Sequence, residues 1–460
     1  MAAGIDDISV YIPKLYVDTE DFAQARDVDI DKMRKGLGIY QMAIADNNQD
    51  PACLAANATY KIMKRNDIHP KDVGRLYIST ESSFDESKAM NAYVVGMLEQ
   101  VYGPGTFGHC GGVETKFACV SGSYALYDNL NWIRAGEADS QYALVVVSDI
   151  AKYDLGSSGE MTQGAGAVAM LLSDDPHLLT FDPKVTATSI SDEYDFYRPF
   201  GKDTPIVHGQ YSNLLYLLQV RKALDLYKKK VLSTKLITPG PDESILDYID
   251  YLNMHLPYSA MGRKALAYLL RHEWRHLPRW KSLIEKIGMA EPVAQHPGTI
   301  ETILANPEFI KDDSKFNRLL METDEFIDIY EKKLSSSLIA SKMIGNLYTA
   351  SLYLGLRSSL EYEHRKGVDL AGKRVGFGSY GSGSSAMVFS GVITEEYADV
   401  VSKMNLDSEM KNRRRLTLDE YELLHRGQMP LTESILSGDG EFILTDVNKS
   451  NSERQYVFKS

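Results

Sequence analysis

VETKFACVSGSYALYDNLNWIRAG, residues 113–136, and YALVVVSD, residues 142–149, are the neighbouring segments that indicate the fold class most directly. In the first segment a strand-like run ends at Cys119, a turn of small residues follows, and apolar residues at helical spacing continue to Gly136. The second segment is apolar at consecutive positions, which is typical of a strand in a sheet covered on both faces. This order predicts a layered α/β fold.

The same pattern extends outward in both directions along the chain. A strand-like VGRLYISTES and an amphipathic stretch over residues 89–102 come before it, and GAGAVAMLLSD follows. Residues from about 235 to 338 are almost wholly helical in pattern and richly charged, whereas GKRVGFGSYGSGSSAMVFSGVI returns to strands and glycine turns. We therefore expect an N-terminal half over 1–175 and a C-terminal half over 176–460, with a mostly helical insertion at about 265–338. The tail after Ser437 has the punctuation of a hairpin.

Bulk composition excludes several classes of protein. The net charge of -13 over 460 residues disfavours nucleic acid as a partner. No apolar run approaches the roughly 20 residues of a membrane-spanning helix, and the N-terminus resembles neither a secretory signal nor a mitochondrial leader, so we expect a cytoplasmic location. The three cysteines lack CxxC spacing, which argues against a disulfide framework and leaves at least one free thiol.

Cys119 is the first candidate for chemistry. It lies at a predicted strand-to-helix turn, where the N–H groups of the helix favour a thiolate and would lower the thiol pKa. The same groups could polarise the carbonyl of a bound thioester. The alternative interpretation is a small buried apolar residue, the commonest role of a cysteine.

Glu81 and His255 are the second and third candidates. In YISTESSFDESKA a strand-like run stops at Glu81, where a carboxyl group near an apolar pocket can serve as a general base or acid. In YLNMHLPYSAMGRKAL a neutral His255 could hydrogen-bond to a carbonyl oxygen, while Arg263 and Lys264 would suit an anionic ligand. Taken singly, a solvated carboxylate and a structural histidine are the more common cases.

Together and in this order, TESSFDESKA, KFACVSG and HLPY resemble the 3-hydroxy-3-methylglutaryl-CoA synthase family. The resemblance extends over nearly the whole chain, through SDIAKYDLGSSGEMTQGAGAVAML, YDFYRPFGKDTPIVHG, GNLYTASLYLGL and FGSYGSGSSAMVFSG. It implies a thiolase-like layered αβαβα fold of two related halves that works as a homodimer.

The resemblance also implies a reaction. Cys119 would accept an acetyl group from acetyl-CoA, and Glu81 would take a proton from the acetyl methyl group. The resulting carbanion equivalent would attack acetoacetyl-CoA, whose carbonyl His255 would hold and polarise, before hydrolysis releases the product. No separate cofactor and no metal are implied. The product would enter the mevalonate pathway of isoprenoid biosynthesis, with a thiolase as a candidate partner.

Further substrate contacts follow only from the resemblance; they are Tyr153, Ser157, Thr162, Ser212, Lys264, Asn346 and Ser379. Two positions depart from the family pattern. Ala260 stands where the family usually has a lysine for a CoA phosphate, and His208 stands where it often has an aspartate. These departures concern CoA binding rather than the three central residues.

Three alternatives stay open at this point. A related synthase that acts on carrier-protein-bound acyl groups in β-branching would be compatible with Ala260. RHEWRH is a literal HExxH match, in which His272, Glu273 and His276 would make a zinc hydrolase, although the flanking arginines would repel a divalent metal. A non-catalytic thiolase-like scaffold would leave the three candidate residues unexplained.

Overall fold

A ten-stranded mixed sheet forms the centre of the protein in the computed structural model, which describes residues 2–292, 300–436 and 438–460. Parallel pairing at both ends (β5, β4 and β6; β13 and β12) flanks antiparallel pairing in the middle. In order across the sheet, the strands are β12 (Tyr251–Met254), β13 (Arg374–Gly381), β14 (Ser385–Ile393), β8 (Leu179–Phe181), β1 (Gly4–Tyr11), β7 (Gly164–Ser173), β6 (Tyr142–Ala151), β4 (Val73–Ser79) and β5 (Glu114–Thr115), with β9 (Ala187–Ile190) beside β14.

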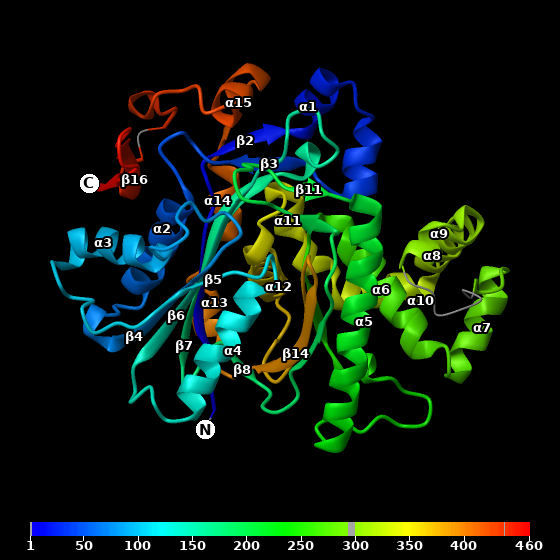
Figure 1. Cartoon of the computed structure of the whole chain (residues 1–460). Helices are drawn as coiled ribbons and strands as arrows, with labels where there is room; N and C mark the ends of the chain where they lie inside the picture. The colour runs from blue at the N-terminus through cyan, green and yellow to red at the C-terminus, as the bar shows by residue number, and fades with distance from the viewer. Residues whose placement is uncertain (1, 293–299, 437) are drawn as a thin grey trace.

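Helices cover this sheet in three layers (Figure 1). One layer contains α2 (Pro51–Arg65) and α3 (Met90–Tyr102), the central one α4 (Ser121–Arg134) and α12 (Ser351–Arg365), and the third α5 (Gly209–Ser233) and α6 (Ser259–Trp274). Side chains that alternate along β6 explain why helices pack on both faces of the sheet. Leu144 and Val146 pack into the core beneath α2, whereas Val145 and Val147 pack into the core around α4 and α12. The expected thiolase-like layered fold is confirmed.

The mostly helical insertion is also confirmed. It lies beside α5 and α6, to the right in Figure 1. Its described helices are α7 (Pro278–Ile287), α8 (Ile300–Leu304), α9 (Pro307–Met321) and α10 (Asp324–Lys333). Arg271 on α6 stacks over Phe316 and hydrogen-bonds to Asp313 at 2.8 Å, which ties α9 to the body of the protein.

The segment before Cys119 differs from the sequence prediction. A strand was expected to run up to the cysteine, but β5 contains only two residues and Phe117 and Cys119 form an isolated bridge. Ala118 has a left-handed φ of 43°, which turns the chain out of the strand direction before α4 begins. The cysteine therefore lies on a tight turn beyond the sheet edge rather than at the end of a strand.

The remaining elements surround this core. None of the described helices is both long and apolar enough to cross a bilayer. The C-terminal tail forms the expected hairpin of β16 (Glu441–Val447) and β17 (Arg454–Lys459). Apart from short 3-10 helices, the other described elements are β2 (Leu15–Asp18), α1 (Thr19–Arg26), a π-helix (Lys32–Leu37), β3 (Gln41–Ile44), β10 (Phe196–Tyr197), β11 (Ile206–Val207), α11 (Ile339–Ile344), α13 (Tyr397–Val401), α14 (Leu406–Lys411), β15 (Arg414–Arg415) and α15 (Leu418–His425).

Candidate active site

The carboxyl ends of three parallel strands bring the first candidate residues together. Ser79 of β4 pairs with Thr115 of β5 on one side and with Val147 of β6 on the other. Glu81 follows β4 and Cys119 follows β5, so both lie beyond the same edge of the sheet. Ligand sites in α/β proteins form at this edge because loops and helix N-termini converge there.

Glu81 and Cys119 interact through their side chains. Burial, together with the nearby Asp149 carboxylate, raises the pKa of Glu81 to about 8. Its Oε1 atom is buried and has no hydrogen-bond partner among the described residues. A carboxyl group with a pKa near the working pH and a free oxygen is suited to take and return protons.

The expected lowering of the Cys119 pKa is wrong. Burial, and then the Glu81 carboxylate, raise the pKa of the Cys119 thiol well above its usual value. The cysteine precedes α4 by two residues, and the attraction of the helix N-terminus does not compensate for these effects. In the unliganded protein the thiol is therefore neutral, and it needs a base to become a nucleophile.

Asp149 holds Glu81 in place, although sequence reasoning did not single it out. It is fully buried on β6, and its Oδ1 accepts hydrogen bonds from the Glu81 backbone N–H at 2.7 Å and the Ser82 hydroxyl at 2.9 Å. Its Oδ2 accepts from the Thr349 N–H at 3.0 Å, which links the two halves of the chain. A single acidic residue within an otherwise apolar strand was the available signal.

Tyr153 and Asn346 lie beside the cysteine. Tyr153 and Tyr348 form a small apolar cluster against which Cys119 packs, with their ring centroids 6.2 Å apart. Asn346 Oδ1 accepts the Tyr348 N–H at 2.8 Å, and the Asn346 amide also interacts with the Tyr153 hydroxyl. The structure thus brings Glu81, Cys119, Tyr153 and Asn346 together.

Two hydroxyl residues predicted for the acyl site lie on the loop after Tyr153. The Thr162 carbonyl accepts the Asn346 backbone N–H at 3.1 Å, while its hydroxyl donates to Gly159 within the same loop. Ser157 Oγ is buried without a hydrogen-bond partner among the described residues. The Thr162 backbone carbonyl therefore positions Asn346, and the Ser157 hydroxyl makes no hydrogen bond to the described residues.

His255 comes from the other half of the chain, immediately after β12. Its backbone N–H donates to Gly378 of β13 at 2.8 Å, and its carbonyl accepts the Tyr216 hydroxyl at 3.0 Å. Only 3% of the residue is exposed, and this burial lowers the pKa of the imidazole to about 3. The ring is neutral at physiological pH, as the hydrogen-bonding role requires.

A buried Asp195 connects the His255 wall with the cysteine, and it is the second residue that sequence reasoning missed. Its Oδ2 accepts the hydroxyls of Tyr380 at 2.8 Å and Ser212 at 2.9 Å. The Tyr380 ring lies 5.1 Å from that of Tyr216, which packs on His255. The Asp195 carboxylate is also close enough to raise the pKa values of Glu81 and Cys119. Ser212 is thus part of the central network.

Ser379 and Lys264 lie away from this centre. The Ser379 hydroxyl accepts from Ser123 of α4 at 2.8 Å, inside the central layer. Lys264 is exposed on α6, with Nζ 3.3 Å from the Tyr258 hydroxyl. Arg263, which could have replaced the lysine missing at Ala260, instead stacks over Tyr330 of the helical insertion. Of the two cations Arg263 and Lys264, it is therefore Lys264 that can bind an anionic ligand.

His208, the second departure from the family pattern, lies at the N-terminus of α5. Its side chain is exposed, and its backbone N–H donates to the Asp195 carbonyl at 2.8 Å. The histidine is therefore next to the central network, with its ring directed to solvent.

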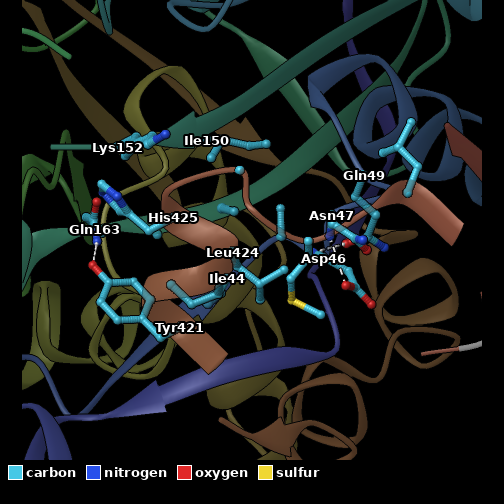
Figure 2. A pocket seen from close by; sticks show the side chains of 18 of the residues that line it. Ile44, Asp46, Asn47, Gln49, Ile150, Lys152, Gln163, Tyr421, Leu424 and His425 are labelled. Carbon is cyan, nitrogen blue, oxygen red and sulfur yellow. Dashed lines mark hydrogen bonds between the residues drawn. The ribbon is translucent and has the colours of Figure 1, made fainter. Parts of the chain in front are cut away.

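Two cavities border the candidate site. One, of about 1010 Å³, is lined by Glu81 and by cations from several segments, namely Lys88, Lys116, Lys152, Arg198, Lys202 and Arg454. The other, of about 480 Å³, lies behind Tyr153, and Figure 2 shows Gln163, Tyr421 and His425 on its wall. Gln163 accepts the Tyr153 N–H at 2.9 Å and donates to Tyr421 at 2.6 Å, so this second wall fixes the Tyr153 backbone.

The HExxH segment does not form the zinc site that was one of the open alternatives. Among the described residues, the group that could hold a metal joins His272 and Glu273 with Asp225 and does not include His276. Both Glu273 oxygens accept from Lys228 at 3.0 Å, and His272 Nε2 lies 2.6 Å from Asp225. The Lys228–Glu273 ion pair and the His272–Asp225 hydrogen bond thus occupy these side chains between α5 and α6.

A cysteine thiol paired with a carboxyl group at the strand ends of a thiolase-like fold defines an acyl-transferring enzyme. Family models described as Hydroxymethylglutaryl-coenzyme A synthase N terminal and C terminal match residues 1–176 and 179–435. The chain belongs to the hydroxymethylglutaryl-CoA synthase family, which confirms the resemblance in its motifs.

Individual relatives agree with this assignment. The chain is 34% identical to the hydroxymethylglutaryl-CoA synthase of Haloferax volcanii over 99% of both chains, and 36% identical to that of Enterococcus faecalis over 92% of this chain and 91% of the relative. The solved structure of MvaS in complex with 3-hydroxy-3-methylglutaryl coenzyme A is 31% identical, with a TM-score of 0.82 over 100% of this chain and 99% of that one. The Curacin pathway HMG synthase, 24% identical with a TM-score of 0.76 over both full chains, shares the fold.

Proposed function

We propose that this chain condenses acetyl-CoA with acetoacetyl-CoA and water to give 3-hydroxy-3-methylglutaryl-CoA and CoA, through an acetyl thioester on Cys119. Family membership supports the overall reaction. The observation that carries the mechanism is the buried Glu81–Cys119 pair, in which a neutral thiol lies beside a carboxyl group with an unused oxygen.

In the first step Glu81 takes the thiol proton, the Cys119 sulfur attacks the acetyl carbonyl, and the bond to the CoA sulfur breaks. The departing CoA thiolate takes the proton back from Glu81, which restores the carboxylate. A thioester then stands on Cys119, and its methyl protons are acidic enough for removal by a nearby base.

In the second step Glu81 takes one of these methyl protons, and the carbanion equivalent attacks the ketone of acetoacetyl-CoA. Neutral His255 donates a hydrogen bond to the ketone oxygen as negative charge develops there, and the alkoxide then takes up the proton held by Glu81, which restores the carboxylate. Asn346 and Tyr153 line the side of the cysteine where the acetyl group forms. Attack of water on the Cys119 thioester finally releases the product and the free thiol.

Release of free CoA on mixing acetyl-CoA with acetoacetyl-CoA tests the overall reaction. We expect a stoichiometric burst with acetyl-CoA alone and sustained release with both substrates. Silence in both experiments would contradict the proposal and favour a non-catalytic scaffold.

The pH dependence of condensation tests the base. Because the pKa of Glu81 is about 8, the active carboxylate becomes more abundant as the pH rises, so the single-turnover condensation rate should increase to a plateau with a midpoint near 8. His255, with a pKa of about 3, should add no second midpoint near the usual imidazole value of about 6.5. The rate is measured by mixing preformed acetyl-enzyme with acetoacetyl-CoA between about pH 6 and about pH 9. A midpoint near 6.5 would contradict both assignments.

A carrier-protein substrate is the alternative that Ala260 favours, since a CoA phosphate contact of the family is lost there. We expect acetoacetyl-CoA to be the better substrate because Lys264 stays exposed and available on α6. Comparing kcat/KM for acetoacetyl-CoA with that for an acetoacetyl carrier protein separates the two possibilities. Preference for the carrier would place this chain among the β-branching synthases.

We also infer a cytoplasmic homodimer whose product enters the mevalonate pathway, with a thiolase as a candidate supplier of acetoacetyl-CoA. The dimer is supported by the edge strand β5 at the end of the sheet and by Val113 beside it, which is 45% exposed. Substituting Val113 with lysine should shift the mass measured by light scattering from dimer to monomer.

A further inference from the structure

The C-terminal hairpin lies beyond the segments matched by the family models, which end at residue 435. It is docked firmly on the outer helices. Asn57 of α2 both donates to and accepts from the backbone of Phe442, at 3.1 and 2.8 Å. Gln100 of α3 donates to the Tyr456 carbonyl and accepts the Phe458 N–H, at 2.8 and 2.9 Å. The hairpin is thus held by side chains of two helices at once.

The alternation of β17 determines which of its side chains face inward. Arg454, Tyr456 and Phe458 are partly buried, whereas the residues between them are exposed. Arg454 Nη1 and the Tyr456 hydroxyl both donate to Asp50 Oδ2, at 3.0 and 2.7 Å. Asp50 in turn caps α2 by accepting the Cys53 N–H at 2.9 Å. The guanidinium of Arg454 is therefore fixed against a rigid helix end.

From this position Arg454 contacts the loop that follows Glu81. Its guanidinium carbon lies 4.0 Å from the centroid of the Phe84 ring, and the Tyr93 ring packs edge-on against Phe84 with the two centroids 5.1 Å apart. Residues 82–89 have no regular secondary structure. The loop is also held by Asp85, which accepts the Tyr93 hydroxyl at 2.9 Å, and at its start by Ser82, whose hydroxyl donates to Asp149 at 2.9 Å. Arg454 also lines the cavity that Glu81 lines.

We propose that Arg454 is a positioning residue for the proton-abstraction step, acting through Phe84 to hold the Glu81 carboxyl group in register with the acetyl methyl group. Asp149 holds the Glu81 backbone and the Ser82 hydroxyl, and the Glu81 carboxyl group interacts with the Cys119 thiol. Acetylation removes the thiol proton and Oε1 has no partner among the described residues, so in the acetyl-enzyme the direction of the carboxyl group depends on the loop that follows it. A stack on a planar cation restricts that loop, and small misplacements of a catalytic group are costly. The inference rests on the proposed role of Glu81.

The test separates the two partial reactions in Arg454→Ala, using the full-length protein. We expect acetylation of Cys119 by acetyl-CoA to stay within about twofold of wild type and condensation with acetoacetyl-CoA to slow about tenfold. Phe84→Ala should have the same effect, and the double variant should be no slower than either single one because both remove one contact. Arg454→Lys should restore part of the rate, since a lysine keeps the charge without the planar stack.

Lys449→Ala, in the exposed turn of the same hairpin, is the matched control and should behave as wild type. Equal slowing of acetylation and condensation in Arg454→Ala, or no slowing of either, would overturn the inference. Additive effects of Arg454→Ala and Phe84→Ala would overturn it as well. If Glu81→Ala itself condenses normally, the proposed function fails instead, so the two failures are distinguishable.

Discussion

Replacing Cys119 with alanine is expected to abolish CoA release, with kcat falling about 100,000-fold or more, as for other enzymes that lose a covalent nucleophile. No other thiol can substitute for it. Cys53 is fully buried in the first turn of α2, and Cys110 lies before β5 on a different turn. The measurement is steady-state release of CoA thiol from acetyl-CoA and acetoacetyl-CoA, followed with a thiol reagent.

Cys110→Ala is the matched control, because it removes another partly buried thiol and should leave turnover unchanged. Cys119→Ser tests the same step more closely, since it keeps a hydroxyl of similar size beside Glu81. Substantial turnover by Cys119→Ala would show that the acetyl group does not pass through this side chain.

Replacing Glu81 with alanine is expected to separate the two halves of the reaction. Acetylation should slow yet persist, because water can accept the thiol proton when the carboxyl group is absent. Condensation should fall about 100- to 10,000-fold, the usual contribution of a positioned general base, because the methyl proton then has no acceptor beside it. Single-turnover mixing of acetyl-enzyme with acetoacetyl-CoA measures this step separately.

Glu86→Ala is the control on the same loop, since Glu86 is exposed and lies five residues further on. It should condense at the wild-type rate. Equal losses of acetylation and condensation in Glu81→Ala would mean that Glu81 serves mainly to deprotonate Cys119, and an unchanged condensation rate would remove it from the mechanism.

Much of the fold and of the candidate site was predictable because several candidate residues directly follow strand-like segments of the sequence. Apolar runs ending at Glu81 and before Asp149 predicted β4 and β6, and β6 is buried as expected for a sheet covered on both faces. The glycine turns after residue 372 correctly indicated β13 and β14. In such segments one local pattern determines both the strand and the residue that follows it.

Other features depend on contacts between distant segments, which a local pattern does not show. The Cys119 pKa is raised rather than lowered because the fold removes the thiol from water and, in addition, places the Glu81 carboxylate beside it. Asp195 lies among aromatic residues in the sequence, and only the fold shows that it accepts hydrogen bonds from Tyr380 and Ser212. The hairpin was predicted, whereas the contact of Arg454 with Phe84 was not.

The most direct test of the central claim is the mass of the peptide containing Cys119 after brief exposure of the protein to acetyl-CoA alone and acid quenching. We predict one added acetyl group on this peptide in wild type and in Glu81→Ala, sensitive to hydroxylamine as a thioester is, and none in Cys119→Ala. In wild type, acetoacetyl-CoA should then discharge the label, whereas in Glu81→Ala it should persist. An acetyl group found on another residue, or an unmodified Cys119 in an active preparation, would contradict the account.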